Sequence, residues 1–203
     1  MKAVYIVNDV KIAKILVDPM RRAILDLRQK PMTQAGLANE LGLTGASLNH
    51  HMKILRSNRL VTVFKREIER HRIMQIFLSS VAYLFVYDLD SLPKNIARYF
   101  YPVSLERARA VVSLLLMYNE QLSSDYEIEH STEAINRISE NLSRHLIIAA
   151  KSYENKTINH GDEQNVYQIY AKAIANLLKE DKKQLSYIQR KNNLLLQDEH
   201  QNS

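Results

Sequence analysis

The sequence of 203 residues contains no cysteine and no tryptophan, and it has only four glycines and four prolines. Without cysteine the chain has no disulfide, no zinc-thiolate site and no cysteine nucleophile. The few glycines leave no glycine-rich phosphate loop after a strand, and no nucleophile-elbow motif is present. The apolar run from Val4 to Val7 is far shorter than a signal-peptide core or a membrane span. We therefore expect a soluble, cytoplasmic protein that contacts no membrane.

Histidine and carboxylate patterns give no support to an enzyme or a metal centre. No two of the seven histidines stand at the HExxH spacing of zinc proteases. A cluster of oxygen and imidazole ligands that suits a divalent cation is formed by Glu127, Glu129, His130 and Glu133. An exposed acidic stretch before a helix explains the same residues, and we favour that explanation. We predict no enzymatic activity, no catalytic residue, no cofactor and no metal site.

Two short helices separated by a three-residue turn are predicted near the N-terminus. The first runs from Gln34 to Leu41 and ends at Gly42, which tolerates the left-handed conformation that closes helices. Thr44 then supplies an oxygen that accepts hydrogen bonds from the first backbone N–H groups of the next helix. This second helix is expected to run from Gly45 to about Ser57.

The second helix has one apolar face and one polar face. Leu48, Met52 and Leu55 recur at i, i+4 and i+7 and are expected to pack inward. Small residues on the opposite face permit close approach to a DNA major groove, where Asn, Ser and His bond to base edges and Lys meets phosphate. An ordinary amphipathic helix with a solvated face explains the same pattern. The residues of the polar face are Ala46, Ser47, Asn49, His50 and Lys53.

A β-hairpin with a charged tip is predicted after these helices. Two β-prone runs, 60–68 and 72–78, are separated by three polar residues. Four cations gather around the tip, where a wing would lie against the sugar-phosphate backbone, and they are Lys65, Arg66, Arg70 and Arg72. A solubilised hairpin end that protects an edge strand is the alternative.

Three blocks of the first 80 residues together resemble winged helix-turn-helix transcription regulators of the ArsR type. They are DPMRRAIL (18–25), LANELGLT (37–44) and SLNHHMKIL (47–55), and they fall in the expected order. The resemblance implies a dimeric, sequence-specific DNA-binding regulator. It also implies that Thr44 to Lys53 form the recognition helix, which adds Thr44 and Gly45 to the candidate DNA contacts. Asp18 and Pro19 would begin the second scaffold helix, and residues 65–72 would form the wing.

Two departures from the family pattern limit what the resemblance implies. The family usually has glycine just before Leu-Val at the end of the recognition helix, whereas this stretch reads SNRLV (57–61). We expect Asn58 to adopt the turn conformation instead. Metal-sensing members carry cysteines on the helix equivalent to residues 34–41, or a spaced Asp-x-His and His-x-x-Glu set on a later helix, and neither occurs here. Metal-triggered release from DNA is therefore not predicted.

The segments before and directly after this module are predicted as follows. Residues 4–6 fit one short strand, and Asn8 or Asp9 caps a helix over residues 10–17. Asp18 caps the next helix, whose first residue is Pro19. The apolar run 81–87 fits either a third strand or the start of a buried helix, and its aromatic side chains are more often core than a ligand pocket. A short helix after Pro93 is expected to end at Pro102.

From Ser104 onward the pattern predicts three long amphipathic helices. The second has apolar residues from Ile135 to Tyr153 spaced by three and four, which favours a partner helix. The third follows a break at Gly161 and has its apolar stripe through Ile174 and Leu178 to about residue 191. These helices suit a dimerisation domain, and a monomeric three-helix bundle is the alternative.

Charge is concentrated in the N-terminal part of the chain. Residues 1–80 contain 14 Lys and Arg against 6 Asp and Glu, whereas residues 81–203 contain 14 against 16. The excess lies in the segment that resembles a DNA reader, and it would attract phosphate whatever the base sequence.

The predicted fold class is mainly α. It comprises a winged helix-turn-helix domain with a β-hairpin wing (1–80), an apolar connecting segment (81–103) and an α-helical dimerisation domain (104–203). The predicted function is a transcriptional regulator, expected to be a repressor, that binds palindromic double-stranded operator DNA as a homodimer. The alternative is a winged-helix protein-interaction module in a larger assembly. A regulator that senses a small-molecule effector is a variant of the first function, and the sequence identifies no effector.

Overall fold

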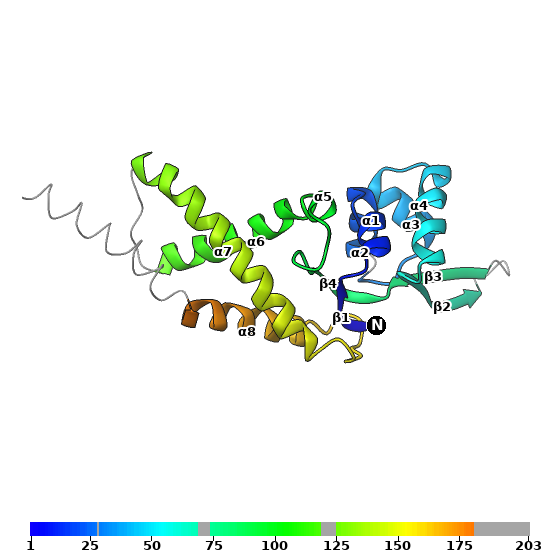
Figure 1. Ribbon diagram of the computed structural model, residues 1–203. Helices are drawn as coiled ribbons and strands as arrows, with labels where there is room; N and C mark the ends of the chain where they lie inside the picture. Colours follow the sequence, from blue (N-terminus) through cyan, green and yellow to red (C-terminus); the bar gives the residue numbers. More distant parts are fainter. Residues whose placement is uncertain (28, 69–73, 119–124, 181–203) are drawn as a thin grey trace, which may run out of the picture. The chain divides into compact units, whose positions relative to one another are not determined.

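The computed structural model describes residues 1–27, 29–68, 74–118 and 125–180, without the side chains of residues 114–118, 125–132 and 134. Its elements are, in order, β1 (Lys2–Val7), α1 (Val10–Leu16), α2 (Pro19–Leu27), α3 (Gln34–Leu41), α4 (Gly45–Ser57), β2 (Val61–Ile68), β3 (Met74–Ser80), β4 (Ala82–Tyr87), α5 (Lys94–Ala97), α6 (Tyr101–Tyr118), α7 (Asp125–Lys151) and α8 (Gln164–Glu180) (Figure 1). This arrangement confirms the predicted fold class, because an antiparallel hairpin follows the two short helices and the described C-terminal part is helical. None of the helices described is both long enough and apolar enough to span a lipid bilayer.

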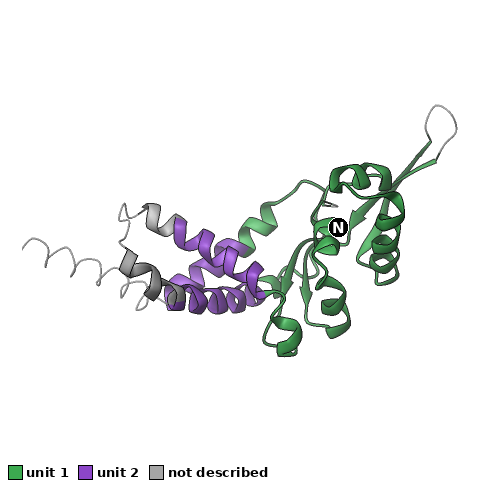
Figure 2. Ribbon diagram, turned by 90° about the horizontal axis from the view of Figure 1, so that it is seen from above, with its two compact units in different colours: residues 1–100, 150–169 green, residues 101–149, 170–203 purple. Residues whose placement is uncertain are grey.

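The chain divides into two compact units, which are coloured separately in Figure 2. Unit 1 comprises Met1–Phe100 and Ala150–Ile169, and unit 2 comprises Tyr101–Ala149 with the residues from Tyr170 onward. The units do not coincide with the three ranges expected from the sequence. The strand β4 and the helix α5 belong to the N-terminal unit, and so does the segment 150–169. The functional division into a DNA-binding domain, a connecting segment and a dimerisation domain stays a prediction.

The core of unit 1 collects the apolar faces of α1 to α4, the base of the hairpin and the segment that follows it. Leu16, Ile24 and Leu37 are fully buried there. Phe100 is also fully buried, and its ring stacks on that of Tyr87 with 4.0 Å between centroids. These aromatic side chains therefore act as core residues, as the sequence pattern favoured.

The N-terminal strand β1 is paired on both of its edges. It lies parallel to β4, with Val4 opposite Leu84 and Val7 opposite Tyr87. On the other edge the Ala3 backbone N–H donates to the Lys156 carbonyl oxygen at 2.9 Å. The run 81–87 is therefore a strand rather than a helix start. Its partner is β1, because hydrogen bonds to a second strand satisfy the backbone of a buried apolar run.

The first two helices begin where the sequence predicts. Asp9 accepts a hydrogen bond from the Ile12 backbone N–H at 2.9 Å at the start of α1. Asp18 Oδ1 accepts from the Met20 backbone N–H at 2.8 Å at the start of α2, where Pro19 is the first residue. Pro19 has no backbone N–H to lose at this position, so it costs nothing there.

The segment around Pro102 differs from the expectation. The short helix α5 ends at Ala97, and α6 already begins at Tyr101 instead of Ser104. Pro102 is thus the second residue of α6 and does not end a helix. Backbone N–H groups of the first helical turn have no intrahelical partner, so proline is tolerated there.

Within unit 2 the described part of α7 buries the residues that its spacing indicates. Ile138, Leu142 and Leu146 are each at most 3% exposed. The buried stripe of α8 differs from the expectation, since Ala173 and Leu177 are buried whereas their neighbours Ile174 and Leu178 are half-buried. His145 of α7 is buried, and its Nε2 lies 3.0 Å from a carboxylate oxygen of Glu180 in α8. The third predicted helix beyond residue 180 lies outside the described residues.

Candidate nucleic-acid interface

The helix α3 has the predicted bounds, and both of its ends are capped. Thr33 Oγ1 accepts a hydrogen bond from the Gly36 backbone N–H at 3.1 Å. Gly42 adopts the left-handed conformation at φ 62°. The Leu43 N–H then donates to the Ala38 carbonyl, and the Gly42 N–H donates to the Asn39 carbonyl. This pair of bonds is the Schellman arrangement, and it turns the chain directly toward α4.

The helix α4 begins at its predicted cap. Thr44 Oγ1 accepts from the Ser47 backbone N–H at 3.2 Å. Thr44 is also exposed, so its hydroxyl is at the surface on the side where α4 begins.

The C-terminal end of α4 shows that the expectation for Asn58 is wrong. Asn58 has φ −101°, and the left-handed residue is Arg59, at φ 57°. The Leu60 N–H donates to the Leu55 carbonyl at 2.9 Å, and the Arg59 N–H donates to the Arg56 carbonyl at 3.0 Å. These bonds require the left-handed turn one residue after Asn58, whose side-chain amide instead donates to the Ile54 carbonyl. Leu55 and Leu60 are fully buried and complete this cap.

The inner face of α4 is fixed by apolar packing and by one polar contact. Leu48, Met52 and Leu55 are at most 2% exposed and belong to the core of unit 1. His51 lies at the edge of this face, with its Nδ1 3.5 Å from Asp18 Oδ2. Asp18 thus caps α2 and contacts α4 at the same time.

The outer face of α4 presents all the residues that the sequence singled out on it. Every residue of this set is exposed: Thr44, Gly45, Ala46, Ser47, Asn49, His50 and Lys53. A methyl group added at Gly45 would meet no atom within 4 Å, so the start of the helix is open to an approaching partner. This arrangement gives one helix with a buried apolar side and a continuous surface of small, hydrogen-bonding and cationic groups.

The hairpin of β2 and β3 forms the predicted wing. Val61 pairs with Ser80 at its base and Ile68 with Met74 at its far end, with an irregularity between Val63 and Lys65. Lys65 is exposed. Its Nζ lies 2.6 Å from Glu67 Oε1 and 4.5 Å from the centre of the Phe77 ring. Arg66 is exposed. Arg70 and Arg72 lie outside the described residues.

The base of the wing is held by the segment between α7 and α8. The imidazole of His160 meets the ring of Phe64 edge to face, with 4.5 Å between centroids. His160 Nδ1 is also 3.1 Å from the Gln29 carbonyl oxygen. Nearby, Tyr83 and Tyr167 both donate hydrogen bonds to the Glu163 carboxylate. All of these residues belong to unit 1, so the wing is positioned from two distant parts of the sequence.

Two residues with suitable chemistry lie beside the outer face and were missed in the sequence. Gln34, the first residue of α3, donates a hydrogen bond from Nε2 to Asn49 Oδ1. Arg56 is exposed, and it follows Lys53 by three residues on α4. Helical spacing signals Arg56, because residues three and four apart share a face. No sequence signal pairs Gln34 with Asn49.

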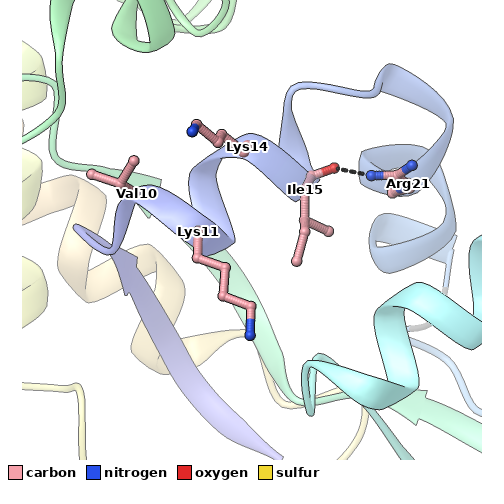
Figure 3. Close-up of a pocket in the computed structure, with 5 residues that line it drawn as sticks. All are labelled: Val10, Lys11, Lys14, Ile15 and Arg21. Atoms are coloured by element: carbon pink, nitrogen blue, oxygen red, sulfur yellow. Dashed lines mark hydrogen bonds between the residues drawn. The ribbon is translucent and has the colours of Figure 1, made fainter.

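A surface hollow lies on α1, outside the outer face of α4. Val10, Lys11, Lys14, Ile15 and Arg21 line it, and its volume is about 520 Å³. Figure 3 shows that Arg21 is turned toward the Ile15 carbonyl oxygen, to which it donates a hydrogen bond of 3.0 Å. Arg21 Nε also lies 3.3 Å from Asp18. This guanidinium group is thus engaged within the protein, and the hollow offers a ligand only the two exposed lysines.

Most of the candidate metal cluster falls in the part of the chain whose side chains are not described. The side chains of Glu127, Glu129 and His130 lie outside the described part of the chain. Glu133 is described, and it forms an ion pair with Arg137 at 2.9 Å. Among the described residues, no three potential metal ligands come together.

A comparison with known protein families gives a match to the helix-turn-helix region. Residues 18–63 match the family described as bacterial regulatory protein, arsR family. The match starts at the cap of α2, covers α3 and α4, and ends in β2. A search of curated proteins found no match. The segment 18–63 is an ArsR-type helix-turn-helix, and the chain that carries it is a DNA-binding transcriptional regulator.

Proposed function

We propose that the protein binds operator DNA as a homodimer, with the outer face of α4 in the major groove, and that it acts as a repressor. The observation that carries this proposal is the burial pattern of α4. Its apolar side is at most 2% exposed, while the side with Asn49, His50 and Lys53 is open to solvent. A helix with small and hydrogen-bonding residues on its free side fits a groove that admits one helix.

The proposed contacts divide by chemistry. Thr44, Gly45, Ala46 and Ser47 let the start of the helix approach the duplex closely. Asn49 and His50 reach base edges, and Lys53 meets a phosphate. In the wing, Lys65 and Arg66 lie along the sugar-phosphate backbone, together with Arg70 and Arg72. Such contacts position the protein without reading the sequence.

The dimer is proposed to form through the helices of residues 104–203. Two copies would place their recognition helices about one duplex turn apart, ~34 Å, and so read a palindrome. An exposed apolar side chain supports this arrangement, because Ile148 of α7 is 58% exposed. We expect Ile148→Glu to raise the dissociation constant of the dimer in sedimentation experiments, whereas Asn136→Glu, at an exposed asparagine of the same helix, serves as a control. A regulator of this type would act in the cytoplasm, where bacterial DNA lies.

The experiment for the DNA contacts starts from operator sequences selected from random duplexes. Asn49→Ala and His50→Ala are expected to reduce binding to the selected operator more than to unrelated DNA, because base contacts discriminate by about 1–3 kcal/mol. Arg66→Ala should weaken both duplexes alike. Asn39→Ala, at an exposed asparagine of α3, is the matched control. Unchanged discrimination in both α4 variants would refute the assignment of the recognition helix.

One observation favours a second candidate function, a winged-helix module that binds a protein partner. The wing exposes apolar side chains on both strands, namely Val63, Phe64, Ile68, Met74 and Ile76. A protein partner would bury such a surface, whereas a phosphate backbone would not. Retention on heparin and on duplex DNA at moderate salt favours the first function. Failure to bind either one, with a stoichiometric protein partner in the purified complex, favours the second.

A further inference from the structure

A hollow of about 380 Å³ lies at the junction of α3 and α4. Its lining consists of Gln34, the first residue of α3, and of four residues on one side of α4, namely Asn49, Met52, Lys53 and Arg56. Met52 is 2% exposed and supplies the buried part of the lining, whereas the two cations are exposed. The hollow is thus open on the same side of α4 as Asn49.

The lining has the composition of an anion site. It contains two cations, two amides and no carboxylate. Neither Lys53 nor Arg56 forms an ion pair with another side chain in the described ranges, in contrast to Lys65 and Arg21, which are paired with carboxylates. Charge-assisted hydrogen bonds from Arg and Lys to phosphate oxygens are stronger than neutral ones. The charges of these two side chains are therefore available to an anionic partner.

The hydrogen bond from Gln34 gives Asn49 a defined polarity. A primary amide has one acceptor oxygen and two donor hydrogens. Because Asn49 Oδ1 accepts from Gln34 Nε2, its amide group presents Nδ2 as a donor. In the major groove the acceptors that such a donor meets are N7 and O6 of guanine, N7 of adenine and O4 of thymine.

We propose that this hollow binds one backbone phosphate of the operator duplex through Arg56 and Lys53, and that Gln34 is a positioning residue that holds Asn49 beside it as a donor. This site rests on the proposed function, since it requires α4 to face the duplex. It adds Arg56 and Gln34 to the interface. A phosphate fixed at this point sets the register of the helix in the groove. The oriented amide restricts Asn49 to bases that offer a hydrogen-bond acceptor.

Salt dependence tests the phosphate contact. Arg56→Gln is expected to lower affinity for the operator and for an unrelated duplex by the same factor, and to reduce the slope of log K against log salt by about 0.9. The deficit of the variant then shrinks about 3.5-fold when salt rises from about 50 to 200 mM. Lys94→Gln removes one exposed charge from α5 and should leave the slope unchanged, and Arg56→Lys should keep the wild-type slope. A wild-type slope in Arg56→Gln would overturn the phosphate site.

The free anion must be distinguished from the DNA phosphate. Inorganic phosphate added without DNA, followed by the NMR signal of the Arg56 guanidinium, is expected to give no saturable shift. A single exposed pair of cations binds a free anion weakly, whereas the duplex holds its phosphate in place through its other contacts. Saturable binding of inorganic phosphate at Arg56 would make a free anion the occupant and overturn the assignment to DNA.

A double-mutant cycle tests the positioning role of Gln34. Gln34→Ala is expected to lose discrimination at the base read by Asn49, and Gln34→Ala with Asn49→Ala should lose no more than Asn49→Ala alone. Gln34→Glu replaces the donor Nε2 by a carboxylate oxygen, which accepts hydrogen bonds. The Asn49 amide is then expected to turn over, with Nδ2 toward residue 34 and Oδ1 toward the DNA, and to prefer a base that donates. This preference is measured as the ratio of the affinities of Gln34→Glu for operators that differ only at the base read by Asn49. The added negative charge weakens binding to each operator equally, so it does not affect the ratio. Additive losses with an unchanged base preference would overturn the positioning role.

The outcomes separate this site from the proposed function. If the wild-type protein selects no duplex sequence, the proposed function fails. If it selects an operator and Asn49→Ala loses discrimination, while Arg56→Gln and Gln34→Ala behave like the Lys94→Gln control, the phosphate site and the positioning role fail and the recognition helix stands.

Discussion

Replacement of Arg59 by glycine is expected to stabilise unit 1. Arg59 is the left-handed residue that ends α4, at φ 57°, and it is the only non-glycine residue with positive φ among those described. A side chain in this conformation costs roughly 1–2 kcal/mol, because its Cβ crowds the following carbonyl oxygen. Glycine removes this cost, but it gives the unfolded chain extra freedom worth roughly 0.4–1 kcal/mol. The net expectation is a gain of about 0.5–1 kcal/mol.

The surroundings of Arg59 add no compensating loss. Its side chain is exposed, and it forms no ion pair with any described residue. The Schellman bonds that it terminates involve backbone atoms of Leu55, Arg56 and Leu60, which the substitution leaves in place. For a chain of this length the gain corresponds to an increase in melting temperature of about 1–4 °C.

Chemical unfolding of Arg59→Gly measures the gain, and hydrogen exchange of the α4 and β2 amides assigns it to unit 1. Localisation is needed because all-or-none unfolding is not the general rule for a chain with two compact units. Arg59→Ala is the matched control, since it removes the charge and keeps the Cβ. Equal stabilisation in both variants would attribute the effect to charge. Destabilisation by glycine would refute the left-handed assignment.

Three further substitutions test other contacts. Thr33→Ala removes the cap of α3 and is expected to cost about 1 kcal/mol, whereas Thr33→Ser retains it; equal unfolding midpoints for the two would contradict the cap. Leu48→Ala empties a fully buried site beneath the outer face of α4 and should cost roughly 2–5 kcal/mol in urea unfolding, and a cost under 1 kcal/mol would contradict its burial. Burial, followed by the hydrogen bond to Glu163, raises the pKa of Tyr83 to about 12 from 10.0. The folded chain then keeps this proton longer than the unfolded chain, so the stabilisation is complete below pH 10 and is lost as pH rises toward 12. Tyr83→Phe should flatten this alkaline loss, and an unchanged pH profile would contradict the contact.

The helix-turn-helix could be predicted because its signals are local. Thr33 and Thr44 cap helices from the residue directly before them, and Gly42 closes α3 through its own backbone conformation. The burial of Leu48 and Leu55 follows from a 3.6-residue period that lies entirely within α4. The candidate face of α4 then follows as the complement of the buried side.

The left-handed residue that follows α4 was expected to be Asn58 but is Arg59, for a physical reason that the sequence shows only in part. Asparagine tolerates the left-handed conformation better than arginine, so residue preference favours Asn58. The position of the turn is decided instead by the packing into the core of unit 1 of both Leu55 and Leu60, which are five residues apart and joined by a backbone hydrogen bond. That packing places the turn at Arg59, where the family usually has glycine. Tertiary burial thus overrides the preference of one residue.

The grouping of residues 150–169 with the N-terminal unit could not be predicted, because it depends on strand pairing over a long sequence separation. The side chains of β1 are buried on both faces of the strand, but burial of side chains does not identify the segments that pair with its two edges. One of them is β4. The other is the segment at Lys156 to Ile158, which is too short to signal a strand and follows a helix whose periodicity continues through Tyr153. Hydrogen bonds between Met1 and Ile158 close this pairing, and His160 then reaches the wing at Phe64. The position of the wing therefore depends on residues that helical periodicity alone assigns to a different domain.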